Sequence, residues 1–391
     1  MMRNFRLTFV LIVLSLCISG CASDVKDIEK LNYASAIGVD YKDGKYHGYI
    51  QFVDFQSIAK STEGKKQTAK IWVGEGVGSS FEESFFALYQ TAQERIYWGH
   101  LTSVIVSEAA FKRGFGEIYD SIVRYYEFRL TPWVFGTRES VKDILSTGGF
   151  LGQSPLSTIL HEPEGIYAQS STIKPIKLHR LIGEIYEPGY TSCIPVLALN
   201  NKQWKEKNQD EPKLMIDGAI FLKNEAYQSY IPLKKLSGLR WMQQGTIRAG
   251  VSVPKNTQET VQIVVENPKT KLKLVSAEGK PKYNIEIKAK AYIVSQTKNS
   301  FLGLQQLTDE TKKTIDQEIV ELFRTGKEMK TDVLNLEHDL YRHHYRQWKA
   351  NSPAGELLLK ENPINGVKID LNIVHSSSEK YSVTNHKDPS K

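Results

Sequence analysis

Cysteine is scarce in this sequence, which has three cysteines among 391 residues. Cys17 and Cys21 lie at the end of an apolar N-terminal run, and Cys193 stands alone in the rest of the chain. A single thiol cannot form an internal disulfide, so the chain is not a small secreted scaffold held together by disulfides. The same shortage excludes zinc and iron–sulfur sites built from cysteines.

Long hydrophobic runs are also missing. The most apolar stretch, Leu7 to Ile18, has about a dozen residues, whereas a helix needs roughly 20 to span a bilayer. Arg3 and Arg6 precede this stretch, which gives residues 1–20 the positive and apolar regions of a secretory signal peptide. We therefore expect the rest of the chain to lie outside the membrane.

The apolar run ends in Ile18-Ser19-Gly20-Cys21, which resembles the lipobox of bacterial lipoproteins. Small residues precede the cysteine there because the signal protease must fit closely around the extended chain. We expect cleavage before Cys21 and a diacylglycerol, with acyl chains such as palmitate, on its sulfur. Each buried CH₂ contributes about 0.8 kcal/mol, so two chains anchor a protein stably. The alternative is an ordinary signal peptide with an incidental cysteine.

A concentrated basic patch is absent as well. The formal net charge is +7, and lysines and glutamates are interspersed along the chain. Nucleic-acid binding requires a basic stripe, so we expect no nucleic-acid partner. The basic excess either favours an anionic membrane surface nearby or serves solubility alone.

Catalytic and cofactor-binding motifs are missing too. The glycine stretch Gly74 to Gly78 lacks the Gly-Lys-Ser/Thr ending of a phosphate loop, and we expect it to be a flexible entry to a helix capped by Ser80. Ser57-Ile58-Ala59-Lys60 has no Lys-Thr-Gly partner, and no Gly-x-Ser-x-Gly elbow occurs. We expect no catalytic residue, no cofactor and no enzymatic activity.

Three histidines, His338, His343 and His344, lie close together beside Glu337 and Asp339. Imidazoles and carboxylates bind zinc, but the His-Glu-x-x-His pattern of a metalloprotease helix is absent. We expect no metal site here. Aromatic neighbours predict the end of a packed helix instead, namely Tyr341, Tyr345 and Trp348.

The chain does have clear alternation of apolar and polar residues. Strand-like runs over 35–41 and 45–53 meet at Asp43-Gly44, a dipeptide typical of a tight hairpin. Further strands are expected over 69–74, 98–107, 131–137 and 193–199, and helices over 81–94, 116–128 and 141–145. This order indicates an α/β domain, of one or two subdomains, over residues 21–200.

Residues 201–215 are polar and charged, and we expect a linker between domains there. Beyond it, strands are expected over 217–222, 260–266, 271–277, 283–295 and 367–374, and helices over 233–243 and from Thr308 onwards. The clean alternation in 283–295 predicts a half-buried antiparallel strand.

The fold class is therefore α+β, or mixed α/β, and multi-domain. We expect an N-terminal α/β region, followed over 216–375 by an antiparallel-sheet α+β domain with a long packed helix. The polar residues 376–391 are expected to form a disordered tail.

Two groups of segments follow the lipobox in a fixed order. The N-terminal group has Ala36-Ile37-Gly38-Val39-Asp40, then Gly99-His100-Leu101 leading to Ser107-Glu108, then Gly114 and Glu127-Phe128-Arg129. The C-terminal group has Asp217-Gly218-Ala219-Ile220-Phe221, Leu236-Ser237-Gly238-Leu239-Arg240-Trp241, residues 331–336 and residues 343–348. In this order they resemble the Ger(x)C lipoproteins, the C subunits of spore germinant receptors in endospore-forming bacteria. The chain departs from the family pattern at Glu337, where the family often has glycine.

The resemblance implies a non-enzymatic subunit of three α/β domains, anchored by lipid to the outer face of the cytoplasmic membrane, which is the inner membrane of the spore. It implies two integral membrane partners, the A and B subunits, in a complex that senses a small-molecule germinant and starts spore germination.

Two segments are candidates for a surface or inter-domain contact: the strand with Asp217, Gly218 and Phe221, and the segment with Gly238 and Trp241. Ordinary turn and core residues would give the same patterns. The alternative function is a solute-binding lipoprotein of a transporter, which predicts two similar α/β lobes that close on a ligand. The two halves of this sequence look different.

Overall fold

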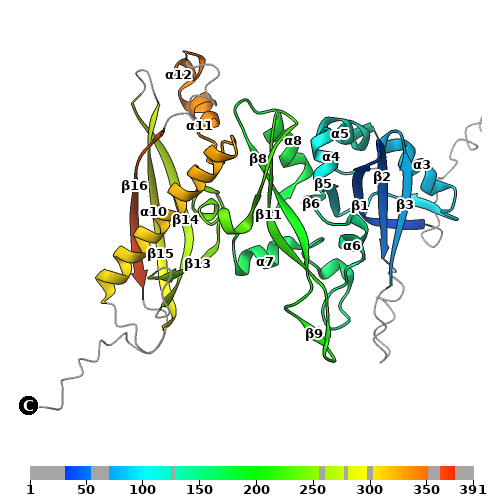
Figure 1. The fold of residues 1–391 in the computed structure, drawn as a ribbon, viewed down its shortest axis with the longest axis horizontal. Coiled ribbons are helices and arrows are strands. Elements are labelled where there is room, and N and C mark those ends of the chain that lie inside the picture. Colours follow the sequence, from blue (N-terminus) through cyan, green and yellow to red (C-terminus); the bar gives the residue numbers. More distant parts are fainter. Residues whose placement is uncertain are drawn as a thin grey trace, which may run out of the picture.

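The structure is a computed structural model that describes residues 31–53, 70–124, 128–254, 260–276, 281–296, 303–350 and 362–374. The expected signal peptide, Cys21 and the expected tail at 376–391 lie outside these ranges. The described chain forms a larger N-terminal unit and a smaller C-terminal unit, placed side by side along the long axis (Figure 1). Within the described residues, no helix is both long and apolar enough to cross a bilayer.

The N-terminal unit is built on one mixed sheet. Among the described residues this sheet has ten strands, eight of them in the order β12-β11-β8-β6-β5-β1-β2-β3, with β4 beside β1 and β7 beside β6. The bounds are β1 Leu31–Lys42, β2 Lys45–Val53, β3 Ile71–Gly78, β4 Arg95–Tyr97, β5 Ser103–Ser107, β6 Trp133–Thr137, β7 Ile176–Lys177, β8 Ser192–Asn200, β11 Lys213–Lys223 and β12 Ala226–Pro232.

The centre of this sheet is parallel and its two edges are antiparallel. Strands β1, β5, β6 and β8 run parallel to one another, as expected when helices connect successive strands. The hairpin predicted at Asp43-Gly44 is confirmed, because β1 and β2 pair there and both turn residues have positive φ, 50° and 76°.

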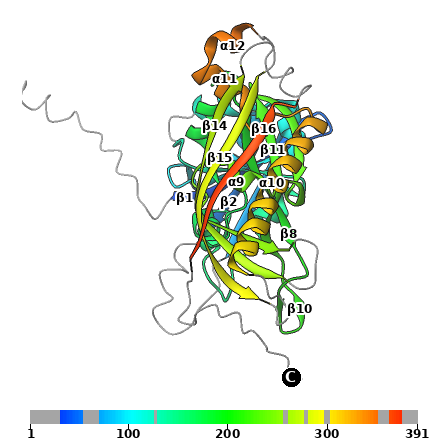
Figure 2. The same cartoon turned by 90° about the vertical axis from the view of Figure 1, so that its left-hand side faces the viewer.

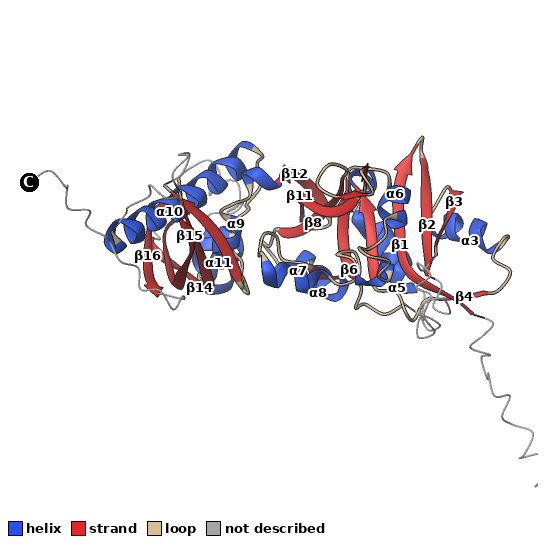
Figure 3. Ribbon diagram, turned by 90° about the horizontal axis from the view of Figure 1, so that it is seen from below, coloured by secondary structure: helices blue, strands red, loops and turns tan. Residues whose placement is uncertain are grey.

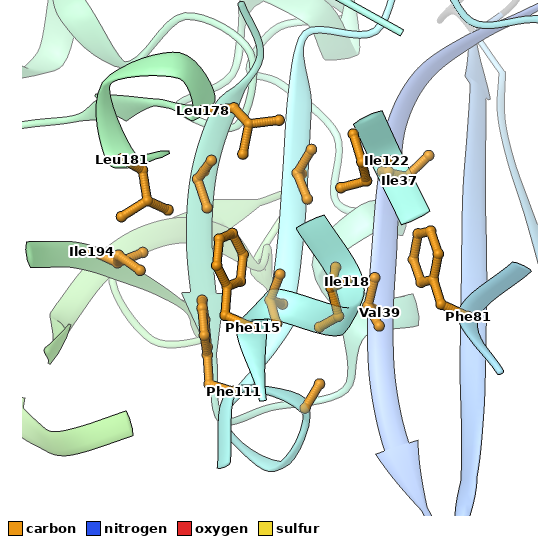
Figure 4. Packing of buried hydrophobic residues seen from close by; sticks show 14 of the residues in the cluster. Ile37, Val39, Phe81, Phe111, Phe115, Ile118, Ile122, Leu178, Leu181 and Ile194 are labelled. Atoms are coloured by element: carbon orange, nitrogen blue, oxygen red, sulfur yellow. The ribbon is translucent and has the colours of Figure 1, made fainter. Parts of the chain in front are cut away.

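Helices cover both faces of the sheet. Successive residues of a strand point to opposite faces, so Val104 and Val106 join one core while Ile105 joins the other. Figure 4 shows the first core, where Phe111 and Phe115 pack against the sheet. The helices are α3 Phe81–Tyr89, α4 Glu108–Arg113, α5 Phe115–Arg124, α6 Val141–Ser146, η3 Pro155–Ser157, α7 Pro163–Gln169 and α8 Leu178–Ile185.

The glycine stretch at 74–78 is not the flexible helix entry that we expected, because it lies within strand β3. Helix α3 packs against this strand so closely that a Cβ on Gly76 would lie 2.0 Å from the backbone oxygen of Ser84. Glycine is required for close approach of the two backbones. Ser80 does cap α3, as predicted, by accepting a hydrogen bond from the N–H of Glu83 (3.2 Å).

The segment 201–215 contains structure of its own. It includes the small hairpin of β9 (Lys205–Glu206) and β10 (Gln209–Asp210) and the start of β11. Strand β11 then pairs with β8 and β12 pairs with β11, so the two strands extend the N-terminal sheet. A domain boundary at 201–215 stays a prediction, but the first sheet continues across it.

In the described residues, the C-terminal unit is a four-stranded sheet with one long helix packed across it (Figure 2). Its strands follow the order β13-β14-β15-β16: Arg248–Val253, Val261–Ser276, Lys282–Gln296 and Ile364–Val374. Its helices are η4 Leu233–Lys235, α9 Leu239–Met242, α10 Leu304–Glu328, α11 Leu336–His343 and α12 Tyr345–Ala350.

The predicted fold class is thus observed, with two local corrections. Strand β15 is antiparallel to β14 but parallel to β16, because the chain crosses the sheet through α10 between β15 and β16. Helix α10 begins after Gly303, and Thr308 lies inside it, where its hydroxyl donates to the carbonyl of Leu304 (2.8 Å).

Candidate functional site

The C-terminal unit rests on strands β11 and β12, the part of the N-terminal sheet nearest to it (Figure 3). Ile220 and Leu222 of β11 belong to the N-terminal core, whereas Phe221 faces the other way. Phe221 packs in one cluster with Leu322 and Phe323 of α10. The two units therefore share apolar packing across their junction.

On one side of this cluster, Asn335 joins the two units. Its backbone is left-handed, with φ 54°, and its side-chain amide pairs with the backbone of Thr191. Oδ1 accepts from the N–H of Thr191 (2.7 Å) and Nδ2 donates to the carbonyl of Thr191 (3.2 Å). The amide thus supplies the donor and acceptor that a neighbouring strand would supply.

Ion pairs reinforce this side of the junction. Lys223 of β11 pairs with Glu337, which is 7% exposed. Arg342 Nε lies 3.0 Å from Glu187 Oε1. Both ion pairs therefore join the N-terminal unit to the C-terminal unit.

On the other side, the segment before α8 contacts the segment after α9. The hydroxyl oxygen of Ser171 accepts from the N–H groups of Ile247 (3.0 Å) and Arg248 (3.1 Å). The N–H of Lys174 donates to Gln243 Oε1 (3.1 Å), and Lys174 Nζ donates to the carbonyl of Gln244 (2.9 Å). Both ends of the junction are thus held by hydrogen bonds.

A cavity of about 690 Å³ lies between these two sets of contacts, and we call it the junction cleft. The N-terminal unit lines it with β6, β7, α8 and β8, and the C-terminal unit with α9 and residues 333–338. Its polar lining includes Lys174, Arg180, Glu184, Gln243, Asn335 and His338.

Glu184 of α8 is a carboxylic acid on the cleft wall whose pKa is raised. Burial raises its pKa to about 7, although the hydroxyls of Ser192 and Tyr190 and the charges of Arg180 and Lys174 act in the opposite direction. Glu184 is therefore a weak acid that titrates near neutral pH.

Cys193 also lines the junction cleft, and it is the cysteine that the described residues contain. Burial and the negative charge of Glu184 both raise the pKa of its thiol. A thiol with a raised pKa stays protonated at neutral pH and is a poor nucleophile.

The structure places the first predicted contact segment at the junction. Asp217 and Gly218 lie on β11, where Asp217 accepts a hydrogen bond from the hydroxyl of Tyr230. A Cβ on Gly218 would lie 2.4 Å from the carbonyl oxygen of Ile231 on β12. Phe221 is 1% exposed and packs between the units.

The second predicted segment connects α9 to α10. The helix expected over 233–243 is two short pieces, η4 and α9, separated at Gly238. Trp241 is 1% exposed, and its Nε1 donates to Glu318 Oε2 of α10 (2.7 Å). Arg240 Nη2 donates to both oxygens of Glu318 (3.0 and 2.9 Å). This segment is therefore core of the C-terminal unit.

The histidine-rich segment does not gather ligands. Within the described residues, no group of three or more His, Cys, Asp or Glu side chains is placed to hold a metal ion. His338 Nδ1 lies 3.4 Å from the carbonyl of Pro188, and its ring contacts Tyr190. Helix α11 ends at His343, and the rings of Tyr341, Tyr345 and Trp348 pack on one another there, as the sequence predicted.

Sequence reasoning did not find the junction cleft. Thr191 and Asn335, which hydrogen-bond to each other at its edge, are 144 positions apart in the chain. Helix α8, which carries Arg180 and Glu184, lies in a stretch that the prolines made look irregular. No local pattern relates these residues, because tertiary folding brings them together.

Comparisons with known proteins give one consistent result. A family model described as "Spore germination protein N-terminal domain" matches residues 24–199, and "Spore germination B3/ GerAC like, C-terminal" matches residues 216–377. The chain is 24% identical over 335 residues to "Putative spore germination protein YfkR" of Bacillus subtilis (strain 168), covering 85% of this chain and 83% of that protein. It is 22% identical over 352 residues to "Spore germination protein B3" of the same organism, covering 87% and 89%.

A solved structure, "Crystal Structure of the GerBC protein", has a similar fold. The TM-score is 0.51 at 18% identity, and the match covers 89% of this chain and all of that one. The predicted family and fold class are confirmed, and the chain belongs to the GerAC-like family of spore germination proteins, as a C-type subunit of germinant receptors.

Proposed function

We propose that this protein is the lipid-anchored, non-enzymatic C subunit of a nutrient germinant receptor, which acts through contacts with integral membrane A and B subunits. The observation that carries the proposal is the match to both spore germination domains, in order, over residues 24–199 and 216–377. Its place is the outer face of the cytoplasmic membrane, which is the inner membrane of the spore.

The lipobox supports the anchoring part of the proposal. Cys21 follows Ile18-Ser19-Gly20 behind a positive and apolar leader. Two acyl chains on one cysteine provide stable anchoring without a spanning helix. The lipid would then keep the two units beside membrane partners rather than free in solution.

The unlike halves argue against the solute-binding lipoprotein of a transporter. That function predicts two similar α/β lobes around a ligand. The N-terminal unit has helices on both faces of a mixed sheet, whereas the C-terminal unit has a four-stranded sheet under one long helix.

Gene deletion tests the receptor function. We expect deletion spores to lose germination with one nutrient, measured as the fall in optical density, while vegetative growth on that nutrient stays normal. Restoring the gene should restore germination. A growth defect with normal germination would favour the transporter instead, as would neighbouring genes for an ATPase and a permease.

A cysteine substitution tests the anchor. We expect Cys21→Ala to release the protein from the membrane fraction and to weaken germination. Cys193→Ala is the matched control, because Cys193 is the cysteine far from the lipobox, and it should leave the membrane fraction unchanged. Full membrane retention and normal germination of Cys21→Ala would contradict the anchor.

A further inference from the structure

The junction cleft has the size and position of a small-molecule site. Ligand pockets in proteins usually measure about 300–1,000 Å³ and often lie between domains. The cleft measures about 690 Å³ and takes its walls from both units. Anything bound there would contact both units at once.

The charge lining the cleft is predominantly positive. Lys174, Lys177 and Arg180 face two acids, Glu164 and Glu184. Among the described residues, none of the three cations has a carboxylate oxygen within ion-pair distance. Lys174 Nζ donates to a backbone carbonyl (2.9 Å) and Lys177 Nζ lies 4.6 Å from the ring centroid of Trp133. Since the pKa of Glu184 is about 7, that acid carries only part of its charge at neutral pH.

Part of the remaining wall is apolar. Phe221 lies on the N-terminal side, and Leu239, Met242 and Leu334 lie on the C-terminal side. In small-molecule sites the apolar groups give affinity and the polar groups give orientation.

We propose that the junction cleft binds a small organic carboxylate with an apolar body. Its carboxylate lies among Arg180 and the neighbouring lysines, and its body packs on the apolar side chain of Met242. This deepens the proposed function, on which it rests for its biological meaning, by giving the C subunit a ligand of its own. Because the ligand contacts both units, it also stabilises their junction.

Isothermal titration of the purified full chain tests this proposal with two probes, hexanoate and phenylacetate. Their neutral amides, hexanamide and phenylacetamide, are matched controls of nearly the same shape. We expect at least one carboxylate to bind saturably at one site, and its amide to bind about tenfold or more weakly, because the charge-assisted contact is lost.

Variants locate the site. Arg180→Gln should weaken carboxylate binding about tenfold or more, and Arg324→Gln, an exposed arginine on α10 outside the cleft, should change it less than about twofold.

The proposal is overturned if neither carboxylate binds saturably, if the amides bind equally well, or if Arg180→Gln binds like the parent protein while keeping its melting temperature. These measurements use purified protein, so their failure would leave the germination test standing. Conversely, normal germination of deletion spores would leave a positive binding result standing.

Discussion

Glu318 holds the C-terminal core together through one buried carboxylate. It is 8% exposed on α10 and accepts three hydrogen bonds from α9, two from Arg240 and one from the indole of Trp241. Glu318→Ala would leave the guanidinium, whose side chain is 18% exposed, and the buried indole N–H without partners. Breaking a buried ion pair on one side costs about 3–5 kcal/mol, and we expect a loss of that size in the free energy of unfolding.

Urea unfolding followed by tryptophan fluorescence measures this loss. Glu318→Gln should lose less, about 1–2 kcal/mol, because its amide oxygen can still accept from Trp241. Glu321→Ala is the control on the same helix. Glu321 is 48% exposed and pairs with Arg324, so its removal should cost less than about 0.5 kcal/mol.

A second substitution separates the lost pair from the unpaired charge. Replacing Arg240 by methionine in the Glu318→Ala background removes the charge that was left buried, so it should recover part of the stability. The reasoning would be refuted if Glu318→Ala cost no more than Glu321→Ala, or if the second substitution made the loss larger.

Three further predictions concern local geometry and pH. Gly238→Ala should destabilise the protein by about 1–3 kcal/mol in urea unfolding, because its Cβ would lie 2.3 Å from the backbone oxygen of Glu318; Gly250→Ala, where no atom lies within 4 Å, is the control, and an equal effect would contradict the steric argument. In the parent protein, the free energy of unfolding should fall as pH rises from about 4.5 to 7, and Glu184→Gln should abolish this fall. Since the folded pKa is raised to about 7, the folded state holds the proton more tightly in this window, and the difference between variant and parent should reach about 1–3 kcal/mol by pH 8; parallel pH profiles would rule this out. Asn335→Ala should speed hydrogen exchange at the N–H of Thr191 and destabilise the junction by about 1–2 kcal/mol, because it removes both hydrogen bonds and disfavours the left-handed backbone. Asn335→Gly favours that backbone, so it should lose less stability.

Local features of the fold were predictable where the residues of one short segment determine the structure by themselves. The Asp43-Gly44 hairpin, the Ser80 cap and the alternation in β15 are of this kind. The glycines of β3 were misread because glycine is disfavoured in strands, and only the close approach of α3 explains them. The parallel β15–β16 pair was missed because alternation shows which face is buried, not which strand lies alongside.

The candidate site was less predictable than the fold. Phe221 and Trp241 were selected from the sequence as contact residues, and both are buried at 1% exposure. A pattern of apolar residues indicates that side chains are buried, but it does not show whether they lie between two units or inside one. Arg180, Glu184 and Thr191 carried no sequence signal, because isolated polar residues acquire a role only from what folds against them.

Sequence alone determined positions where the chain reverses, the class of fold and the resemblance to germinant receptor C subunits, and it predicts a leader that ends in a lipobox cysteine. Each depends on residues adjacent in the chain or on segments in a fixed order. The tertiary structure decided that β11 and β12 complete the first sheet, that α10 packs on Phe221, and that Asn335 pairs with Thr191 from 144 positions away. The junction cleft exists only because the two units meet there, so no local pattern could encode it.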